Sequence, residues 1–317
     1  MLLDVSNKLA KYGVKHAYVE GVTKSFKDME ALHAQMDEYV DGVVEFLKKL
    51  AAAGKKFDGG LVVFDFDELG FKNKKLKQTF GKLRVSLFTP VTIEPGSGLP
   101  LGGDPRDQKT LFRGGYFPSS GISKLAGSIA LPYLEPNTGK VMQLRVNSFH
   151  CHQLVAHETQ HYLDYNNLNP EVENVERLVK ETSDIPDWYS RETEFNAVVR
   201  EITHSVRRFL RLLEKDQSTS KPKFKPAKIH ALFGVQFSKL DMFLESVFAS
   251  MENRSTPTAI FEFGKDSHCK HVVQRYKGYN GSYRFKQDFD DRLKELWKYV
   301  VDWYKRADRK YHFNKAK

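Results

Sequence analysis

The chain has 317 residues, of which 40% are hydrophobic and 28% are charged, so it can bury a sizeable core in one or two domains. Its net charge of +10 is spread along the sequence without a zinc-finger spacing, an RNA-binding motif or a glycine-rich phosphate loop, which argues against a nucleic-acid-binding protein. Two cysteines cannot make a disulfide framework, and we find neither a signal peptide nor an apolar run of membrane-spanning length, so we expect a cytoplasmic protein.

The first part of the chain is predicted to be a helix followed by short strands. Apolar residues recur at helical spacing through residues 25–54. Two strands follow, a short apolar run at 61–66 and an alternation of apolar and polar residues at 83–87. The glycine- and proline-rich stretch 95–108 has no periodicity, so it is predicted to be a loop after an N-terminal α/β region, residues 1–94.

Further strand candidates lie between this loop and residue 146. One surrounds residues 115–117, and another covers residues 128–133, where apolar side chains alternate. Pro132 has no N–H to donate to a ladder, so the strand at 128–133 is predicted to lie at a sheet edge. Residues 141–146 offer one more candidate.

From residue 148 onward the pattern is mostly helical. Helices are predicted at residues 149–165, 190–214, 237–251 and 285–309. The polar, proline-bearing stretch 216–228 is predicted to be a linker before a helical C-terminal region, residues 229–317. The whole layout predicts an α+β fold.

The helix predicted at residues 149–165 carries the motif H-E-x-x-H, formed by His157, Glu158 and His161. Ser148 suits the start of this helix. Residues four apart on a helix lie one turn apart on one face, so both imidazoles can reach one metal ion at about 2.0–2.1 Å. Glu158 is rotated by about 100° from His157 and is placed to contact a water on the metal. Zinc would lower the pKa of that water toward about 7, and Glu158 would serve as base and then as acid.

A catalytic zinc needs three protein ligands, so a third ligand has to come from elsewhere in the chain. The metzincin pattern requires a glycine and a histidine where Asp164 and Asn167 stand, which argues against that branch. A glutamate on the next predicted helix is the other common solution, and Glu192 and Glu194 are available. Burial favours Glu192, which lies about 60° from the apolar stripe of that helix, against about 100° for Glu194. The need for an open zinc position favours Glu194, and Ala197 leaves room for another helix to approach.

These residues resemble the zincin-like metallopeptidases of the glutamate-ligand type, the gluzincins, and in particular predicted peptidases encoded by bacteriophages. The resemblance is carried by the HExxH motif with Asp164 and by a second set of residues: Tyr189, Arg191, Glu194 and Ala197. It implies a zincin-like core over residues 109–215, in which a small mixed sheet with an edge strand packs on the HExxH helix. It also implies one Zn²⁺ per chain, held by His157, His161 and Glu194. Glu192 and Asn196 depart from the family pattern, which often has proline and a second acid at these positions.

Several other residues are candidates for supporting roles. Asp164 could fix the tautomer of a ligand imidazole, or it could be a solvated acid near the helix end. Four residues are candidates to stabilise a tetrahedral oxyanion, although packing or a surface position explains each one singly: Tyr165, Tyr189, Arg191 and His204. Two clusters of histidine and cysteine lack a partner cluster at zinc-finger spacing and are interpreted as incidental: residues 150–152 and 268–271.

The sequence therefore predicts a zinc-dependent metallopeptidase that acts on a protein or peptide substrate. The alternative is a virion-associated structural or assembly protein, with viral assembly partners, that has a zincin fold and little or no turnover. The basic charge and the unassigned terminal thirds fit this alternative. The intact motif favours the enzyme, because an inactive descendant would have no need to keep Glu158.

Overall fold

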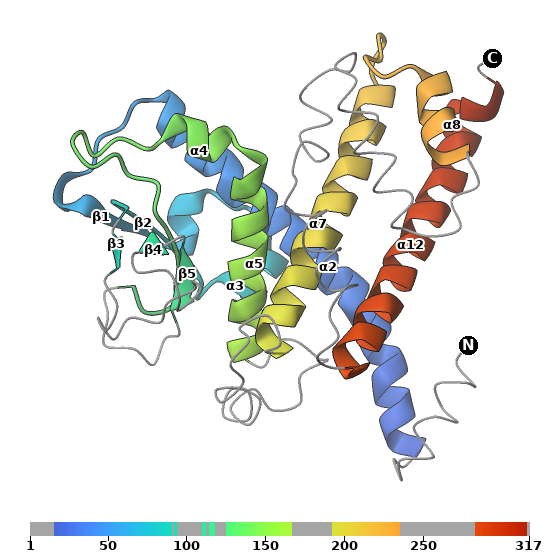
Figure 1. The fold of residues 1–317 in the computed structure, drawn as a ribbon, viewed down its shortest axis with the longest axis horizontal. Coiled ribbons are helices and arrows are strands. Elements are labelled where there is room, and N and C mark those ends of the chain that lie inside the picture. Colours follow the sequence, from blue (N-terminus) through green and yellow to red (C-terminus); the bar gives the residue numbers. More distant parts are fainter. Residues whose placement is uncertain are drawn as a thin grey trace.

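The computed structural model of the chain describes residues 16–90, 92–93, 110–111, 114–117, 125–166, 192–234 and 283–315. Within these residues the fold is α+β, with a small sheet at one end and long helices beside it (Figure 1). Helix α5 (Phe149–Tyr165) stands between the sheet and helix α7 (Glu192–Gln217), and α12 (Tyr283–Tyr311) packs on α7 from the other side. No helix in this described part is long and apolar enough to cross a membrane.

Helix α2 (His16–Ala52) covers most of the helix predicted at residues 25–54, although it begins before Ser25, and it supplies one wall of the core. Its apolar positions recur every three or four residues, and this stripe is fully buried: Met36, Tyr39, Val43 and Leu47. The stripe packs against the sheet and the apolar side of α5 in one continuous core. A short helix, α3 (Lys74–Phe80), closes this core, with the ring of Phe80 centred 4.6 Å from that of Tyr39.

The main sheet has the strand order β1-β2-β6-β5. Its strands are β1 (Leu61–Phe64), β2 (Arg84–Phe88), β5 (Gly115–Phe117) and β6 (Ser128–Leu131). Strands β2 and β6 are parallel, whereas the β1–β2 and β5–β6 pairs are antiparallel, so the sheet is mixed. The remaining short elements are β3 (Thr92–Ile93), β4 (Thr110–Leu111), α4 (Gln143–Asn147), α8 (Pro226–Gly234) and the 3₁₀ turns Asp58–Gly60, Phe66–Leu69 and Phe313–Lys315.

The strand predicted at residues 128–133 exists as β6 but not at a sheet edge, and the strand predicted at residues 141–146 does not form. The segment at residues 128–133 is not a sheet edge, because β6 pairs with β2 on one side and β5 on the other, and all four of its residues are buried. Pro132 follows the end of β6, so its missing N–H removes nothing from the ladder. The segment 141–146 makes a single bridge from Val141 to Leu134 and then turns into α4.

The stretch 216–228 connects α7 to α8 and is held to the end of α7 by hydrogen bonds, although most of its residues are exposed. The buried Asp216 accepts hydrogen bonds from the backbone N–H groups of Lys223 and Phe224, at 3.0 and 2.9 Å. Gln217 donates to the carbonyl of Phe224 at 2.6 Å, and the Phe224 ring is buried before α8 begins. The loop predicted at residues 95–108 and the helix predicted at 237–251 lie outside the described residues.

Candidate metal centre

The HExxH motif lies in the middle of α5, on a helix that packs antiparallel to α7. The direction follows from three contacts: His152 stacks near His204, His157 meets Glu201, and Gln160 meets Arg200. As the residue number rises along α5 it falls along α7, so the second half of α5 faces the beginning of α7. The start of α5 is Ser148 as predicted, although its hydroxyl donates to the carbonyl of Arg145 and does not cap the helix.

The two imidazoles of the motif converge on one point. His157 Nε2 and His161 Nε2 lie 3.1 Å apart, with the ring planes at 77°. An ion about 2.0–2.1 Å from both nitrogens would make an N–ion–N angle of about 95–102°, close to the tetrahedral geometry of zinc. Without an ion, the same separation suits a hydrogen bond between the two rings. The separation of the two nitrogens is therefore compatible with one shared ion.

Glu201 of α7 supports the first of these histidines, and the sequence pattern does not point to it. Its Oε1 lies 2.6 Å from His157 Nδ1, and its side chain is only 8% exposed. A carboxylate in this place holds a proton on Nδ1 and leaves the lone pair of Nε2 directed at His161, as is usual behind metal-binding histidines. The signal in the sequence is faint: Glu201 is an acid seven residues, or two turns, after Glu194.

The acids of α5 are buried. Glu158 is 5% exposed and follows His157 directly, so it leaves the helix about 100° around from the imidazole. Asp164 is fully buried and accepts a hydrogen bond from Gln160 at 2.8 Å, and Gln160 accepts one from Arg200 at 3.1 Å. Asp164 is therefore not a solvated acid at the helix end. Its action on a ligand imidazole stays a prediction.

The third ligand stays a prediction as well. Tyr189 and Arg191 lie outside the described residues, and so do the side chains of Glu192 and Glu194. The backbone of α7, which begins at Glu192, places residue 194 two turns before Glu201. Because α5 and α7 are antiparallel, this turn of α7 is level with the end of α5, on the His161 side of the motif.

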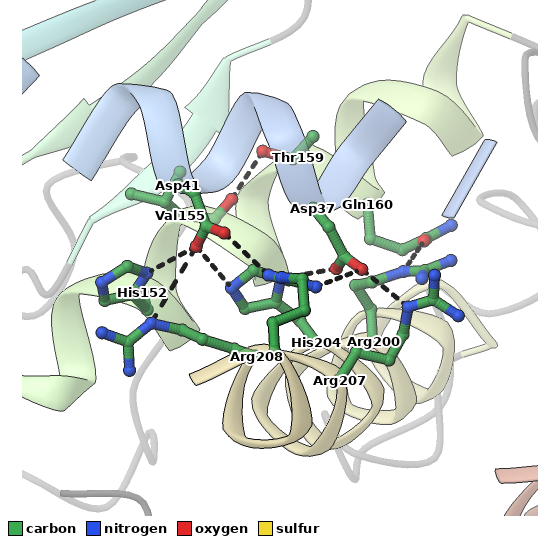
Figure 2. A network of polar contacts seen from close by, with 11 residues as sticks. Asp37, Asp41, His152, Val155, Thr159, Gln160, Arg200, His204, Arg207 and Arg208 are labelled. Carbon is green, nitrogen blue, oxygen red and sulfur yellow. Dashed lines mark hydrogen bonds and ion pairs between the residues drawn. The ribbon is translucent and has the colours of Figure 1, made fainter. Parts of the chain in front are cut away.

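A second polar cluster lies between α2, α5 and α7, at the first half of the HExxH helix (Figure 2). One donor atom from each of Asp41, His152 and His204 lies within 4.8 Å of the others. Asp37 of α2 is 2.8 Å from His204 Nδ1. The arginines around the two aspartates come from α7: Arg207 is 2.6 Å from Asp37, Arg211 is 2.7 Å from both acids, and Arg208 is 3.9 Å from Asp41.

Burial and the neighbouring positive groups shift the pKa values of the two aspartates in this cluster in opposite directions. Burial alone would raise the pKa values of Asp37 and Asp41, but the imidazoles and guanidiniums beside them outweigh it and hold both pKa values well below the usual range. Burial lowers the pKa of His152 to about 3 in spite of the nearby Asp41, so its imidazole is neutral at physiological pH. The carboxylates of Asp37, which is buried, and of Asp41, which is partly exposed, thus remain charged beside the neutral imidazole of His152.

The cluster corrects one interpretation and bears out another. His152 is not an incidental histidine, because it meets Asp41 and His204 in the interior. His204 is fully buried and hydrogen-bonded to Asp37, so it is an interior residue and does not meet a substrate oxyanion. Burial raises the pKa of Cys151 to about 12, which keeps its thiol neutral and unreactive. The cluster at residues 268–271 lies outside the described residues.

Strand β5 brings a sheet edge beside the motif. Gly114, just before β5, has φ +123°, and a Cβ there would lie 2.9 Å from the carbonyl oxygen of Ala130 and 3.2 Å from Leu154 of α5. The ring of Tyr116 is centred 5.8 Å from that of Tyr162 and 5.9 Å from that of Tyr165. Among the described residues, β6 is the only strand that pairs with β5. Strand β5 therefore packs on the part of α5 that follows His161, and its outer edge lies beside that part of the helix.

No protein-family model matches the chain, and no curated protein or solved structure matches it. The resemblance to the gluzincins therefore depends on the residues of the two sequence patterns. The geometry adds the convergence of the two imidazoles and the carboxylate of Glu201 behind His157.

Proposed function

We propose that the chain is a zinc-dependent metallopeptidase that hydrolyses a protein or peptide substrate. The observation that carries the proposal is the 3.1 Å separation of His157 Nε2 and His161 Nε2, with Glu201 on the outer nitrogen of His157. Two imidazoles with lone pairs directed at one point are what a zinc site of this type requires. Glu194 is proposed as the third ligand on the sequence pattern alone.

The zinc ion, Glu158 and Glu201 have separate roles in the proposed reaction. Bound zinc would acidify a water molecule and polarise the scissile carbonyl. Glu158 accepts the proton of the attacking water and then delivers it to the leaving amine. Glu201 keeps the proton of His157 on Nδ1, so that Nε2 stays available as a ligand.

The substrate is proposed to bind along the outer edge of β5. An extended peptide can add to an exposed sheet edge through backbone hydrogen bonds, and β5 runs beside the end of α5 that carries His161. Strand β6, which was predicted to be a sheet edge, cannot bind a peptide in this way because it pairs with strands on both sides. Backbone pairing of this kind would accept many side chains, so an unfolded protein is a suitable first substrate.

The test combines zinc content with hydrolysis of a fluorescently labelled, unfolded casein. The purified full chain should carry about one zinc at the motif, and His157→Ala/His161→Ala should lose it. Glu158→Gln should keep the zinc and lose hydrolysis by roughly 10²–10⁴-fold, because removing a general base costs about this much. Glu45→Gln, which changes an exposed glutamate of α2, is the matched control and should behave like the wild type.

Unchanged hydrolysis by Glu158→Gln would refute the mechanism. Zinc that stays in the double histidine variant at the wild-type level would refute the metal site itself. A wild-type chain that binds zinc at the motif and hydrolyses no unfolded protein would favour the alternative of a virion-associated structural or assembly protein with a zincin fold.

A further inference from the structure

We propose that Asp41, His152 and His204 hold a second metal ion, a divalent transition ion such as zinc, which joins α2 to α5 and α7. Two imidazoles and one carboxylate are a donor set that binds zinc and related ions. One donor atom from each residue lies within 4.8 Å of the other two. The cluster is separate from the HExxH motif, because His152 precedes His157 by more than one helical turn.

The donor atoms of this cluster are buried without hydrogen bonds. Asp41 Oδ1, His204 Nε2 and both ring nitrogens of His152 have no hydrogen-bond partner among the residues that the structure describes. His152 is 5% exposed and His204 is fully buried. Burying polar atoms without partners is unfavourable, so a bound group that satisfies all of them would stabilise the fold.

The spacing of these atoms is closer to that of metal ligands than to that of hydrogen-bonding groups. Asp41 Oδ1 lies 3.5 Å from His152 Nδ1 and 3.8 Å from His204 Nε2. Both distances are too long for good hydrogen bonds. Ligands of a tetrahedral zinc ion lie about 3.3 Å apart, so small side-chain rotations would bring the donors onto one ion.

The orientation of His204 is that of a metal-binding histidine. Its Nδ1 lies 2.8 Å from Asp37 Oδ1, which fixes the proton on Nδ1 and directs the lone pair of Nε2 toward Asp41. The same arrangement joins Glu201 to His157 in the HExxH site. In each case a buried carboxylate from a neighbouring helix holds one nitrogen and leaves the other for an ion.

The arginines limit how tightly this site binds. Arg211 occupies Asp41 Oδ2 at 2.7 Å, which leaves Oδ1 to face the histidines. Arg208 Nε lies 3.9 Å from Oδ1, so its positive charge would repel a cation held there. The second ion should therefore bind more weakly than the ion of the HExxH motif, and removing the charge of Arg208 should tighten it.

The experiment uses the full chain with His157→Ala/His161→Ala, stripped of metal with a chelator and titrated with Zn²⁺ against a fluorescent zinc indicator. We expect this variant to bind one ion. Adding Arg208→Gln should raise the affinity roughly tenfold or more, because a nearby positive charge has been removed. Adding His152→Phe, which keeps a ring of similar size in the interior, should abolish binding. Arg306→Gln, which removes an exposed arginine of α12, is the control and should change nothing.

Failure of the double variant to bind zinc would overturn the proposal and leave ordered water as the group between these side chains. Unchanged affinity on adding Arg208→Gln would also overturn it, even if the His152→Phe chain did not fold. The outcome is independent of the peptidase proposal. If the wild type and the double histidine variant each bind one ion with the same affinity, the second site stands and the zinc site at HExxH is refuted.

Discussion

Replacing Glu201 with glutamine tests whether the buried carboxylate behind His157 tunes the metal site. Its Oε1 is 2.6 Å from His157 Nδ1, and its side chain is 8% exposed, so the bond is short, charge-assisted and shielded from water. Glutamine keeps the size and one acceptor oxygen but removes the charge. Loss of such a supporting carboxylate typically lowers metal affinity by about 10–100-fold, which corresponds to about 1.4–2.8 kcal/mol.

The assay is competition for zinc between the protein and a chelator of known affinity. Glu214→Gln is the matched control, because Glu214 lies on the same helix with its side chain 48% exposed and 3.8 Å from Lys310, and its loss should leave zinc binding unchanged. The melting temperature of the metal-free Glu201→Gln chain separates a folding defect from a binding defect. Wild-type zinc affinity in a folded Glu201→Gln chain would show that this contact does not act on the metal.

Two further predictions concern Asp37 and the third ligand. Asp37→Asn should lower the free energy of unfolding at pH 7 by about 3–5 kcal/mol, because it leaves the buried guanidinium of Arg207 and the imidazole of His204 without this carboxylate. The pKa of Asp37 in the folded chain is below its unfolded value of about 3.9, so the stability that Asp37 contributes is complete above pH 3.9 and decreases as the pH falls below it. Denaturation at pH 7 and pH 3 should therefore show a smaller destabilisation by Asp37→Asn at pH 3. An equal destabilisation at both pH values would contradict the ion-pair account. Zinc affinity should fall more in Glu194→Ala than in Glu192→Ala, and the opposite order would assign the ligand to Glu192 while leaving the two histidines in place.

Local periodicity predicted the elements that depend on short-range spacing. The helices α2, α5, α7 and α12 and the strands β1, β2 and β6 overlap the segments that apolar spacing indicated, although α2 begins before residue 25. The convergence of His157 and His161 is equally local, because residues four apart meet on one helical face. The prediction of a sheet edge from Pro132 was wrong, because proline prevents pairing only inside a strand and β6 ends before it. Where β6 ends is decided by its pairing with strands that are distant in the sequence.

The polar interior could not be predicted in the same way, because it depends on which faces of separate helices meet. One histidine and four arginines of α7, at positions 200, 204, 207, 208 and 211, follow helical spacing and would normally mark a solvated face. The face is covered instead by α2 and α5, and α2 presents Asp37 and Asp41 four residues apart to meet it. The signal available in the sequence was this pair of acids beside a buried apolar stripe, with a basic helical face elsewhere in the chain.

The register of α5 along α7 determines which residues of α7 lie beside the histidines of both sites. It sets Glu201 against His157 and, nearly one turn further along α7, places His204 beside His152. Both supported histidines have a carboxylate at Nδ1 and therefore have Nε2 available to a ligand. A shift of α7 by one turn would replace Glu201 with Ala197 or His204 opposite His157 and would remove the carboxylate from it. The ion pairs of Asp37 and Asp41 with α7 oppose that shift, so the acids of α2 hold the helix that supports the proposed zinc site.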